Sequence, residues 1–215
     1  MRRFLPTFLL IILVLAFYPF VFKDDSKQTL KGLPWQVNLL ADGSSQVFGL
    51  TLDNSTLGDA VDTLGTDMEL AVIAASDEAG NLEMYYAHYR AGLLGGKLIL
   101  ATARDDASTM AYRINAVKTE VLKTGSRKYV LTEEDHEKAF QSIITNIAFI
   151  PAVNLDHDTI IKRFGQPGAI VHQDELVHYL YPEKGLAIAL SEEGKEVLQY
   201  VSPKLFSRLQ EPLEK

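Results

Sequence analysis

The sequence predicts an α+β protein: an N-terminal transmembrane helix, then two helix-plus-antiparallel-sheet repeats with a helical insert between them. Three observations lead to this fold class. Residues 4–22 carry no charge, segments 56–65 and 156–165 share one helical pattern, and a series of short strand-like runs follows each segment. The expected parts of the chain are a transmembrane anchor or signal peptide at 1–22, a tether at 23–32, a first α+β repeat at 33–105, a helical insert at 106–150 and a second α+β repeat at 151–215.

The N-terminal segment has the length and the flanks of a membrane-spanning helix. Its 19 uncharged residues, at about 1.5 Å per residue, match a hydrocarbon core about 30 Å thick. Arg2 and Arg3 precede them, so the positive-inside rule places the rest of the chain outside the cytoplasm. We therefore expect a single-pass inner-membrane protein with a periplasmic C-terminal part. The alternatives are a signal peptide with Val14 and Ala16 at its cleavage site, which gives a secreted or periplasmic protein, and a buried helix.

Composition and charge exclude several function classes. The chain has 215 residues, of which 47% are hydrophobic and 23% charged, and this balance is typical of a folded protein. It contains 21 Lys and Arg against 28 Asp and Glu, a net charge of -7, and no long basic run, so we expect no nucleic-acid partner. The absence of cysteine excludes disulfides, thiol catalysis and thiolate zinc sites.

Each repeat is expected to begin with a short amphipathic helix that ends at a glycine, Gly65 in the first and Gly165 in the second. Apolar residues recur in both helices at positions i, i+1 and i+4. The aligned residues are Ala60, Val61 and Leu64 in the first helix and Ile160, Ile161 and Phe164 in the second. The strand-like runs lie at 68–75, 82–89 and 97–103 in the first repeat and at 169–172, 176–181, 186–190 and 196–201 in the second. The same order of elements twice favours a repeat.

The insert is predicted to hold two helices. Apolar residues at spacings of four, three and four predict an amphipathic helix over residues 107–123. Residues 128–131 are expected to form a short strand, and residues 132–135 resemble a capping box that opens a second helix. The apolar positions are Met110, Ile114, Val117 and Val121 in the first helix and Phe140, Ile143, Ile144 and Ile147 in the second. The alternative for residues 147–153 is that they leave this helix and form the strand that opens the second repeat.

The sequence contains no motif of nucleophilic, metallohydrolase or nucleotide chemistry, so we expect a protein that is not an enzyme and has no cofactor or metal site. The densest clusters of histidine and carboxylate, at 156–158 and 172–175, are expected to form a helix N-cap and a hairpin turn rather than a metal site. The glycines within 92–96 are interpreted as a hairpin turn. The acids at 105–106 and 133–135 are interpreted as helix caps rather than paired catalytic acids.

Aromatic residues gather in the corresponding strand of each repeat. Outward-facing tyrosines make good protein contacts because they bury a large area with few rotamers to freeze. The alternative is that tyrosine simply favours strands and packs across them. The predicted protein-binding face consists of Tyr85, Tyr86, Tyr89, Tyr179, Tyr181 and His178.

The second repeat carries a recognisable pattern. Gly165 and Pro167 follow its helix, and Tyr179 and Tyr181 lie in the aromatic strand. This pattern resembles the SmpA/OmlA family of small envelope proteins, in which a helix ends in Leu-Gly-x-Pro and a strand with an aromatic-x-Tyr motif follows. The resemblance implies helices packed on one face of a small antiparallel sheet, and the doubled unit resembles the tandem fold of the β-lactamase inhibitor proteins. This chain departs from the family because 65–67 lacks the proline and no N-terminal cysteine is present.

The resemblance and the N-terminal segment together give the expected function. We expect a membrane-anchored, extracytoplasmic module of the cell envelope that binds or scaffolds an envelope protein without catalysis. Residues 4–22 would contact the lipid bilayer. One alternative is a small-ligand or lipid-binding envelope protein that uses a groove between the repeats. A further alternative is a hydrolase that uses scattered acids with His157 or His178.

Overall fold

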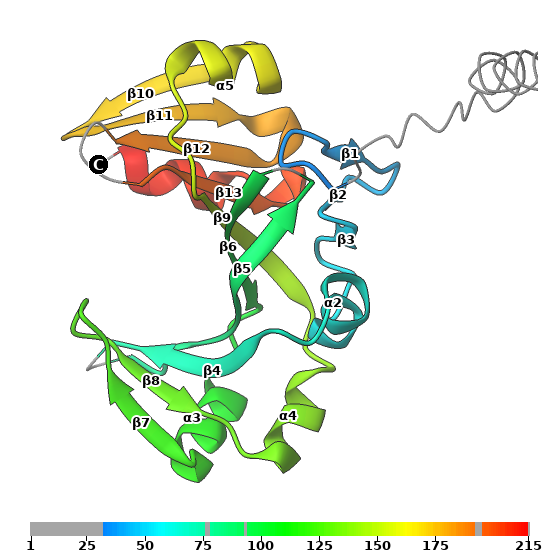
Figure 1. Cartoon of the computed structure of the whole chain (residues 1–215), viewed down its shortest axis with the longest axis vertical. Coiled ribbons are helices and arrows are strands. Elements are labelled where there is room, and N and C mark those ends of the chain that lie inside the picture. Colours follow the sequence, from blue (N-terminus) through cyan, green and yellow to red (C-terminus); the bar gives the residue numbers. More distant parts are fainter. Residues whose placement is uncertain (1–31, 76–77, 93, 192–194, 215) are drawn as a thin grey trace, which may run out of the picture. The chain divides into compact units, whose positions relative to one another are not determined.

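The computed structural model describes residues 32–214 apart from 76–77, 93 and 192–194 (Figure 1). Lys31–Lys215 forms one compact unit, in which the strands make a three-stranded and a ten-stranded sheet. The small sheet contains β1 (Asn38–Leu39), β2 (Ser45–Val47) and β3 (Leu50–Thr51). In spatial order, the antiparallel large sheet contains β10 (Ala169–Gln173), β11 (Leu176–Tyr181), β12 (Leu186–Ser191), β13 (Val197–Val201), β9 (Ile144–Pro151), β6 (Leu94–Thr102), β5 (Asn81–Ala91), β4 (Glu69–Ala74), β8 (Arg127–Val130) and β7 (Lys118–Val121).

The described residues also form five short α-helices. These are α2 (Leu57–Leu64), α3 (Asp106–Asn115), α4 (Glu133–Ala139), α5 (His157–Phe164) and α6 (Ser207–Gln210). Short 3-10 turns are η1 (Pro182–Lys184), η2 (Pro203–Leu205) and η3 (Glu211–Glu214), the last of which continues α6.

Helices α2 and α5 confirm the predicted pair of short helices. Thr56 caps α2 in a capping box: its hydroxyl accepts from the Asp59 N–H at 3.1 Å, and the Asp59 carboxylate accepts from the Thr56 N–H at 2.8 Å. Asp156 caps α5 by accepting a 2.7 Å hydrogen bond from a backbone N–H in the first turn. Both helices end at glycines with positive φ, 98° at Gly65 and 85° at Gly165, a conformation that other residues rarely adopt.

The predicted fold class is wrong in its main feature, because the strands form one sheet instead of two separate repeats. Strands β4 to β9 make one half, strands β10 to β13 make the other, and β9 pairs with β13 to join them. Phe149 of β9 pairs with Leu98 of β6 on one side and Leu198 of β13 on the other. The alternation of apolar residues predicts the strands but does not specify which strands are neighbours.

The predicted helix over 107–123 is also wrong in its second half. Helix α3 ends before Ala116, whose φ of -51° and ψ of 130° are extended. The β-branched residues Val117, Thr119 and Val121 then favour a strand, and β7 extends the large sheet through β8. Ile114, Val117 and Val121 of the predicted apolar stripe are 79%, 66% and 74% exposed.

The second helix of the insert is shorter than predicted for the same reason. Thr132 caps α4 by accepting a 3.1 Å hydrogen bond from the Asp135 N–H, as the capping pattern predicts. The β-branched run from Ile143 onward then leaves the helix, and Ile144 is buried in β9 instead of on a helix face. The alternative of a strand over 147–153 is correct in kind, but β9 begins three residues earlier and ends at Pro151. Residues 106–150 are therefore a mixed segment that contributes three strands to the large sheet.

The predicted transmembrane helix and single-pass inner-membrane location require a correction. Across 32–214, with the gaps given above, no helix has the length and apolar character that a membrane crossing requires. The predicted membrane anchor and its contact with the bilayer depend on segment 4–22, which lies outside the described residues.

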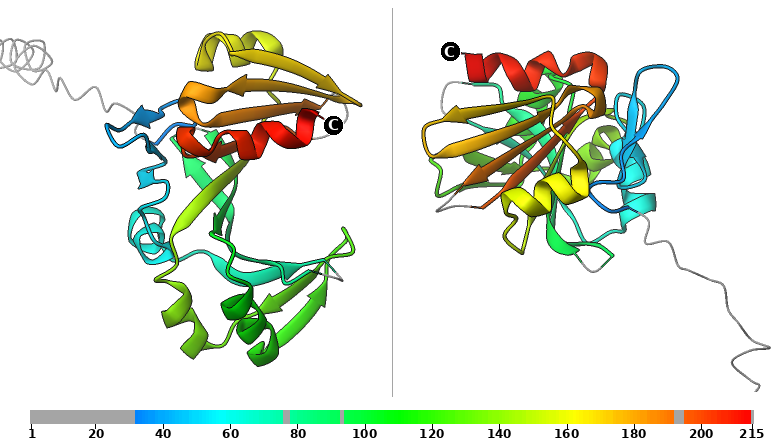
Figure 2. Two further views of the ribbon diagram at one scale, coloured as in Figure 1. Left: turned by 180° about the vertical axis from the view of Figure 1, so that it is seen from behind. Right: turned by 90° about the horizontal axis from the view of Figure 1, so that it is seen from above.

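The two faces of the large sheet are covered differently. One face packs in the main core against the three-stranded sheet and helices α2 to α5, with fully buried residues that include Leu57 and Ile160. On the other face, Leu180, Ala187 and Val201 pack against Phe206 and the α6 segment. Figure 2 shows α5 and α6 on opposite sides of the β10 to β12 strands. In the described residues, α6 and η3 cover this second face only at its β10 to β13 end.

Candidate binding face

A row of residues from five neighbouring strands crosses the less covered face of the large sheet. Successive residues of a strand point to opposite faces, so the register decides which side chains share this row. Tyr85, Ile99 and Ala148 in the row are half-buried. In spatial order the row contains Glu69 of β4, Tyr85 of β5, Ile99 of β6, Ala148 of β9 and Gln199 of β13.

A second row lies beside the first, where Ala71, Glu83 and Ala101 pair across β4, β5 and β6. The two alanines are small, so the backbone beneath them forms a shallow floor between larger side chains. Figure 1 shows that the sheet curves with this face on its inner side. We call the surface made by both rows the open face, and its residues are Glu69, Ala71, Glu83, Tyr85, Ile99, Ala101, Ala148 and Gln199.

The open face contains a pocket of about 320 Å³ around Glu83. Apolar side chains form most of its wall, because Ile73, Ile99 and Leu122 line it together with the ring of Tyr85. The remaining lining residues are Glu69, Ala71 and Lys128. We call this cavity the Glu83 pocket.

The charges of the Glu83 pocket are unevenly paired. The Lys128 ammonium forms an ion pair with the Glu69 carboxylate, and the Lys128 side chain is only 19% exposed. No hydrogen bond or ion pair joins the Glu83 carboxyl to any other described residue. Burial raises the pKa of that carboxyl above its usual value, since desolvation disfavours the charged form. The pocket therefore holds one acid that lacks a counter-ion.

A second pocket, of about 560 Å³, lies where the β5–β6 hairpin approaches the start of β13. His88, Arg90, Lys97 and Lys195 line it with apolar residues that include Ile150, and we call it the basic pocket. The register shifts between Tyr86 and Tyr89 of β5, and such a bulge re-aims the side chains that it carries. None of the four basic side chains forms an ion pair with a carboxylate in the described part of the chain. The basic pocket therefore has the opposite charge to the chain as a whole.

Three of the six predicted binding residues lie in the core. Tyr86, Tyr179 and Tyr181 are each 3% exposed on the covered face of the sheet. The Tyr86 hydroxyl donates to the Gly65 carbonyl at 3.1 Å, and the Tyr181 hydroxyl donates to the Gly165 carbonyl at 3.0 Å. Burial raises the pKa of both hydroxyls to about 12. These two tyrosines therefore tie the strands to the C-terminal ends of α2 and α5.

The other predicted residues are divided between the two faces. Tyr89 is half-buried on the covered face, with its ring centroid 5.5 Å from that of Phe48 and 6.2 Å from that of Phe149. Tyr85 lies on the open face. His178 lies on the same side of the sheet as Tyr85 but in β11, and burial lowers the pKa of its imidazole. Of the predicted set, Tyr85 is the residue with its side chain in a pocket of the open face.

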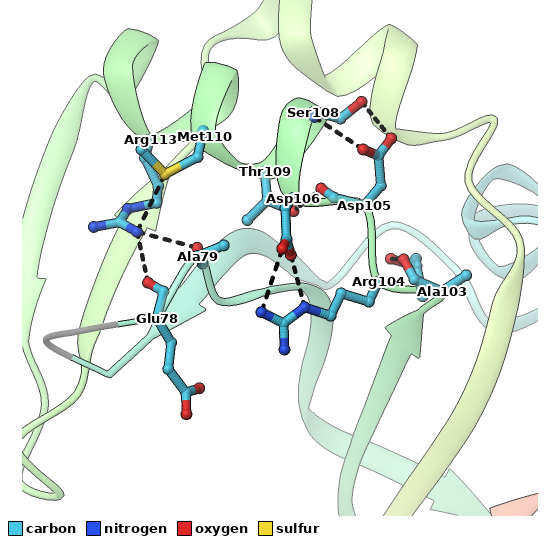
Figure 3. Close-up of polar contacts among 11 residues, drawn as sticks. Glu78, Ala79, Ala103, Arg104, Asp105, Asp106, Ser108, Thr109, Met110 and Arg113 are labelled. Atoms are coloured by element: carbon cyan, nitrogen blue, oxygen red, sulfur yellow. Dashed lines mark hydrogen bonds and ion pairs between the residues drawn. The ribbon is translucent and has the colours of Figure 1, made fainter.

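The acids that the sequence offers for catalysis are occupied by local contacts, as Figure 3 shows for the start of α3. Asp105 accepts from the Ser108 N–H at 3.1 Å and from the Ser108 hydroxyl at 2.6 Å, and these bonds lower the pKa of the Asp105 carboxyl. Asp106 pairs with Arg104 at 2.7 Å. His157 contacts the Tyr179 hydroxyl at 2.9 Å. No group of three or more His, Asp and Glu in the described residues is arranged to hold a metal ion.

Sequence reasoning missed Glu83, Ile99 and Ala148. A single glutamate in an alternating strand is normally a solvent-facing residue, so nothing in the local pattern separates Glu83 from an ordinary surface acid. Ile99 and Ala148 share a row only because β6 pairs with β9, which lies beyond the insert. Ala71 and Ala101 are small, but they belong to different strands, so their shared face emerges only once β4, β5 and β6 are paired.

Comparison with protein-family models, curated proteins and solved structures finds no match to this chain. The fold and site therefore define the class of protein by themselves: a mostly β protein with one curved ten-stranded antiparallel sheet, one pocket on its open face and a second pocket at the β5–β6 hairpin. The resemblance to SmpA/OmlA proteins stays a prediction based on Gly165, Pro167, Tyr179 and Tyr181. Two of these residues, Gly165 and Tyr181, contact each other through the hydrogen bond described above.

Proposed function

We propose that this protein is a non-catalytic, extracytoplasmic binding module of the cell envelope, and that a protein partner docks on its open face. The observation that carries the proposal is the row from Glu69 to Gln199, whose central residues are half-buried and apolar, on a face of the sheet that α6 and η3 cover only at its β10 to β13 end. The resemblance to SmpA/OmlA proteins supports a partner from the cell envelope.

The dimensions of the open face favour a protein over a small molecule. The row crosses five strands, and neighbouring strands lie about 4.8 Å apart, so its ends are separated by roughly 19 Å along the sheet. A surface of that width, with half-buried apolar residues at its centre and polar residues at its rim, has the layout of a protein interface. Tyr85 is the residue best suited to anchor a partner, because tyrosine is enriched among the residues that dominate binding energy.

Site-specific photo-crosslinking in cells tests this proposal. A photoreactive phenylalanine analogue replaces Gln199, an exposed residue at one end of the row, and the matched control replaces Gln141, an exposed residue between α4 and β9. We expect one discrete adduct from position 199 and none from position 141, with the partner identified by mass spectrometry. An identical adduct pattern from both positions, or no adduct from position 199, would refute docking on the open face.

Affinity measurements with the purified partner make the test quantitative. Ile99→Asp places a charge at the centre of the row, and Ile114→Asp makes the same change on exposed α3. We expect Ile99→Asp to weaken the affinity roughly 30-fold or more, as for a central interface residue, and Ile114→Asp to leave it unchanged. Ala148→Lys repeats the test at a second position, and a thermal melt of each variant separates lost binding from lost folding.

The basic pocket favours a second candidate function, the binding of a small anionic ligand. Its volume of about 560 Å³ lies within the range of about 300–1,000 Å³ that is typical of small-molecule sites. Inorganic phosphate at low ionic strength is the simplest probe, because a ligand that binds the folded state raises the melting temperature. We expect a smaller increase in the Arg90→Gln, Lys97→Gln double variant than in the wild type. Equal increases in both proteins would exclude this candidate.

A further inference from the structure

We infer that the Glu83 pocket receives a basic side chain, lysine or arginine, from the protein partner. This inference rests on the proposed function and deepens it, because it names the chemistry that the partner must offer to the open face. It follows from the position of Glu83, the pairing of its neighbours, and the shape and lining of the pocket.

The first step is the unfavourable environment of Glu83. The residue sits in the second row between Ala71 and Ala101, where the small neighbours offer no hydrogen-bond donor from their side chains. Glu83 is half-buried, and a carboxylate that loses part of its hydration costs stability unless a hydrogen bond or a counter-ion compensates it. Glu83 has neither in the described residues. Features that break the local rules of stability in this way are concentrated at functional sites.

Lys128, the cation that lines the same pocket, is already engaged in an ion pair. Its ammonium pairs with the carboxylate of Glu69, which also lines the pocket. When Glu83 is ionised, the two carboxylates and one ammonium leave the pocket with one negative charge that is not compensated. A cationic group is therefore the occupant that fits the electrostatics, whereas an acidic group would be repelled.

The walls of the Glu83 pocket suit a long side chain with a charged end. Ile73, Ile99 and Leu122 offer apolar surface to the methylene stem of lysine or arginine. The ring of Tyr85 lies in the same wall, where it can attract a cation through its π-face. The volume of about 320 Å³ is at the small end of the range for ligand sites, about 300–1,000 Å³, and so suits one side chain rather than a whole ligand.

The first experiment isolates the pocket with two small probes that mimic such a side chain. Butylguanidinium carries the charge, and butylurea is its neutral counterpart of nearly the same shape. The full chain is labelled at its glutamate carboxyl carbons and titrated with each probe, with the solvent-exposed Glu137 as the internal reference. We expect a saturable shift of the Glu83 signal with butylguanidinium and a much smaller one with butylurea. In the Glu83→Gln variant, the signal of Glu69, which lines the same pocket, should show no saturable shift with butylguanidinium. Equal responses to both probes, or no saturable response to the cation, would overturn the inference.

The second experiment distinguishes a failure of this inference from a failure of the proposed function. Glu83→Gln and Glu137→Gln make the same chemical change inside and outside the open face, and the affinity of each variant is measured for the partner captured through position 199. We expect roughly a 30-fold loss with Glu83→Gln, the scale for breaking a desolvated charge pair, and no loss with Glu137→Gln. Charge reversal to Glu83→Lys should be rescued by the reverse change at a lysine or arginine of the partner.

The outcomes of these measurements separate cleanly. If Ile99→Asp abolishes binding while Glu83→Gln behaves like Glu137→Gln, the partner uses the open face but places no basic side chain in the Glu83 pocket, and the inference is wrong. If neither Ile99→Asp nor Glu83→Gln changes the affinity, the partner binds elsewhere, and the proposed function fails together with the inference.

Discussion

The hydroxyl groups of Tyr86 and Tyr181 give the sharpest test of how the two halves of the sheet are held to their helices. Tyr86→Phe removes a hydroxyl that donates to the Gly65 carbonyl at 3.1 Å and lies 3.3 Å from a second acceptor, the Ala60 carbonyl. Tyr181→Phe removes a 3.0 Å bond to the Gly165 carbonyl. Both rings are buried and keep their packing after the change, so the experiment isolates the hydrogen bonds.

The expected losses follow from the number and burial of the acceptors. A hydrogen bond contributes about 0.5–1.5 kcal/mol net, and a buried group left without a partner costs about 1–3 kcal/mol. We expect Tyr181→Phe to lower the free energy of unfolding by about 1 kcal/mol, and Tyr86→Phe by about 1–2 kcal/mol because the single proton of its hydroxyl lies within reach of two carbonyls, both of which lose that donor. In a protein of this size, each 1 kcal/mol corresponds to about 2–4 °C in melting temperature.

Urea unfolding followed by tryptophan fluorescence provides the assay. Trp35 is the only tryptophan, and it packs against Phe164 of α5 with ring centroids 6.2 Å apart, so its signal reports on the core. The matched control is Tyr85→Phe, because the Tyr85 hydroxyl has no hydrogen bond to the described residues and its loss should cost less than about 0.5 kcal/mol. If Tyr86→Phe and Tyr181→Phe were as stable as Tyr85→Phe, these hydroxyls would not anchor the helices, and the reasoning would fail.

Three further predictions concern single positions. A Cβ at Gly96 would lie 2.6 Å from the Phe149 ring, whereas a Cβ at Gly95 would meet nothing within 4 Å, so thermal melts should show Gly96→Ala losing about 1–3 kcal/mol and Gly95→Ala nearly nothing. Asp156→Ala removes the N-cap of α5 and should lower the free energy of unfolding in urea by about 1 kcal/mol. Asp156→Asn should keep the wild-type stability, because asparagine also caps helices, and this difference between the two variants would identify capping as the cause. Burial raises the pKa of Glu83 in the folded state. Between the unfolded and the folded pKa the folded state therefore binds more protons than the unfolded state, and the free energy of unfolding falls as pH rises through that window. Glu83→Gln should flatten this fall, and an unchanged slope of unfolding free energy against pH would contradict the burial of the Glu83 carboxyl.

Local signals in the sequence identify the helices that have strong caps. The helices predicted over 56–65 and 156–165 are correct because each segment combines a polar N-cap, a short apolar pattern and a C-terminal glycine within ten residues. The insert misled the prediction because most of the apolar residues with helical spacing are β-branched, Met110 and Phe140 being the exceptions. Val117 and Val121 are exposed in the β7 hairpin, where strand pairing outweighs the helical period.

The continuous sheet and the open face could not be derived in the same way. The pairing of β9 with β13 joins the two halves of the sheet. Neither strand has a local sequence feature that predicts which strand it pairs with. The position of Tyr85 could be anticipated from its aromatic strand, but the burial of Tyr86 beside it follows from the alternation of faces combined with the placement of α2. Glu83 becomes a candidate only when the strands on either side of it are known.

The central place of β9 has a consequence for how the protein is made. Phe149 pairs with residues about fifty positions before it and about fifty after it, and contacts between such distant residues slow folding. During synthesis, β9 emerges well before β13, so its outer edge has no strand to pair with until β13 has also left the ribosome. An unpaired edge of this kind is prone to associate with other chains. A chain truncated before Val197 would therefore be expected to accumulate as an aggregate, because β13 decides whether the sheet is completed at all.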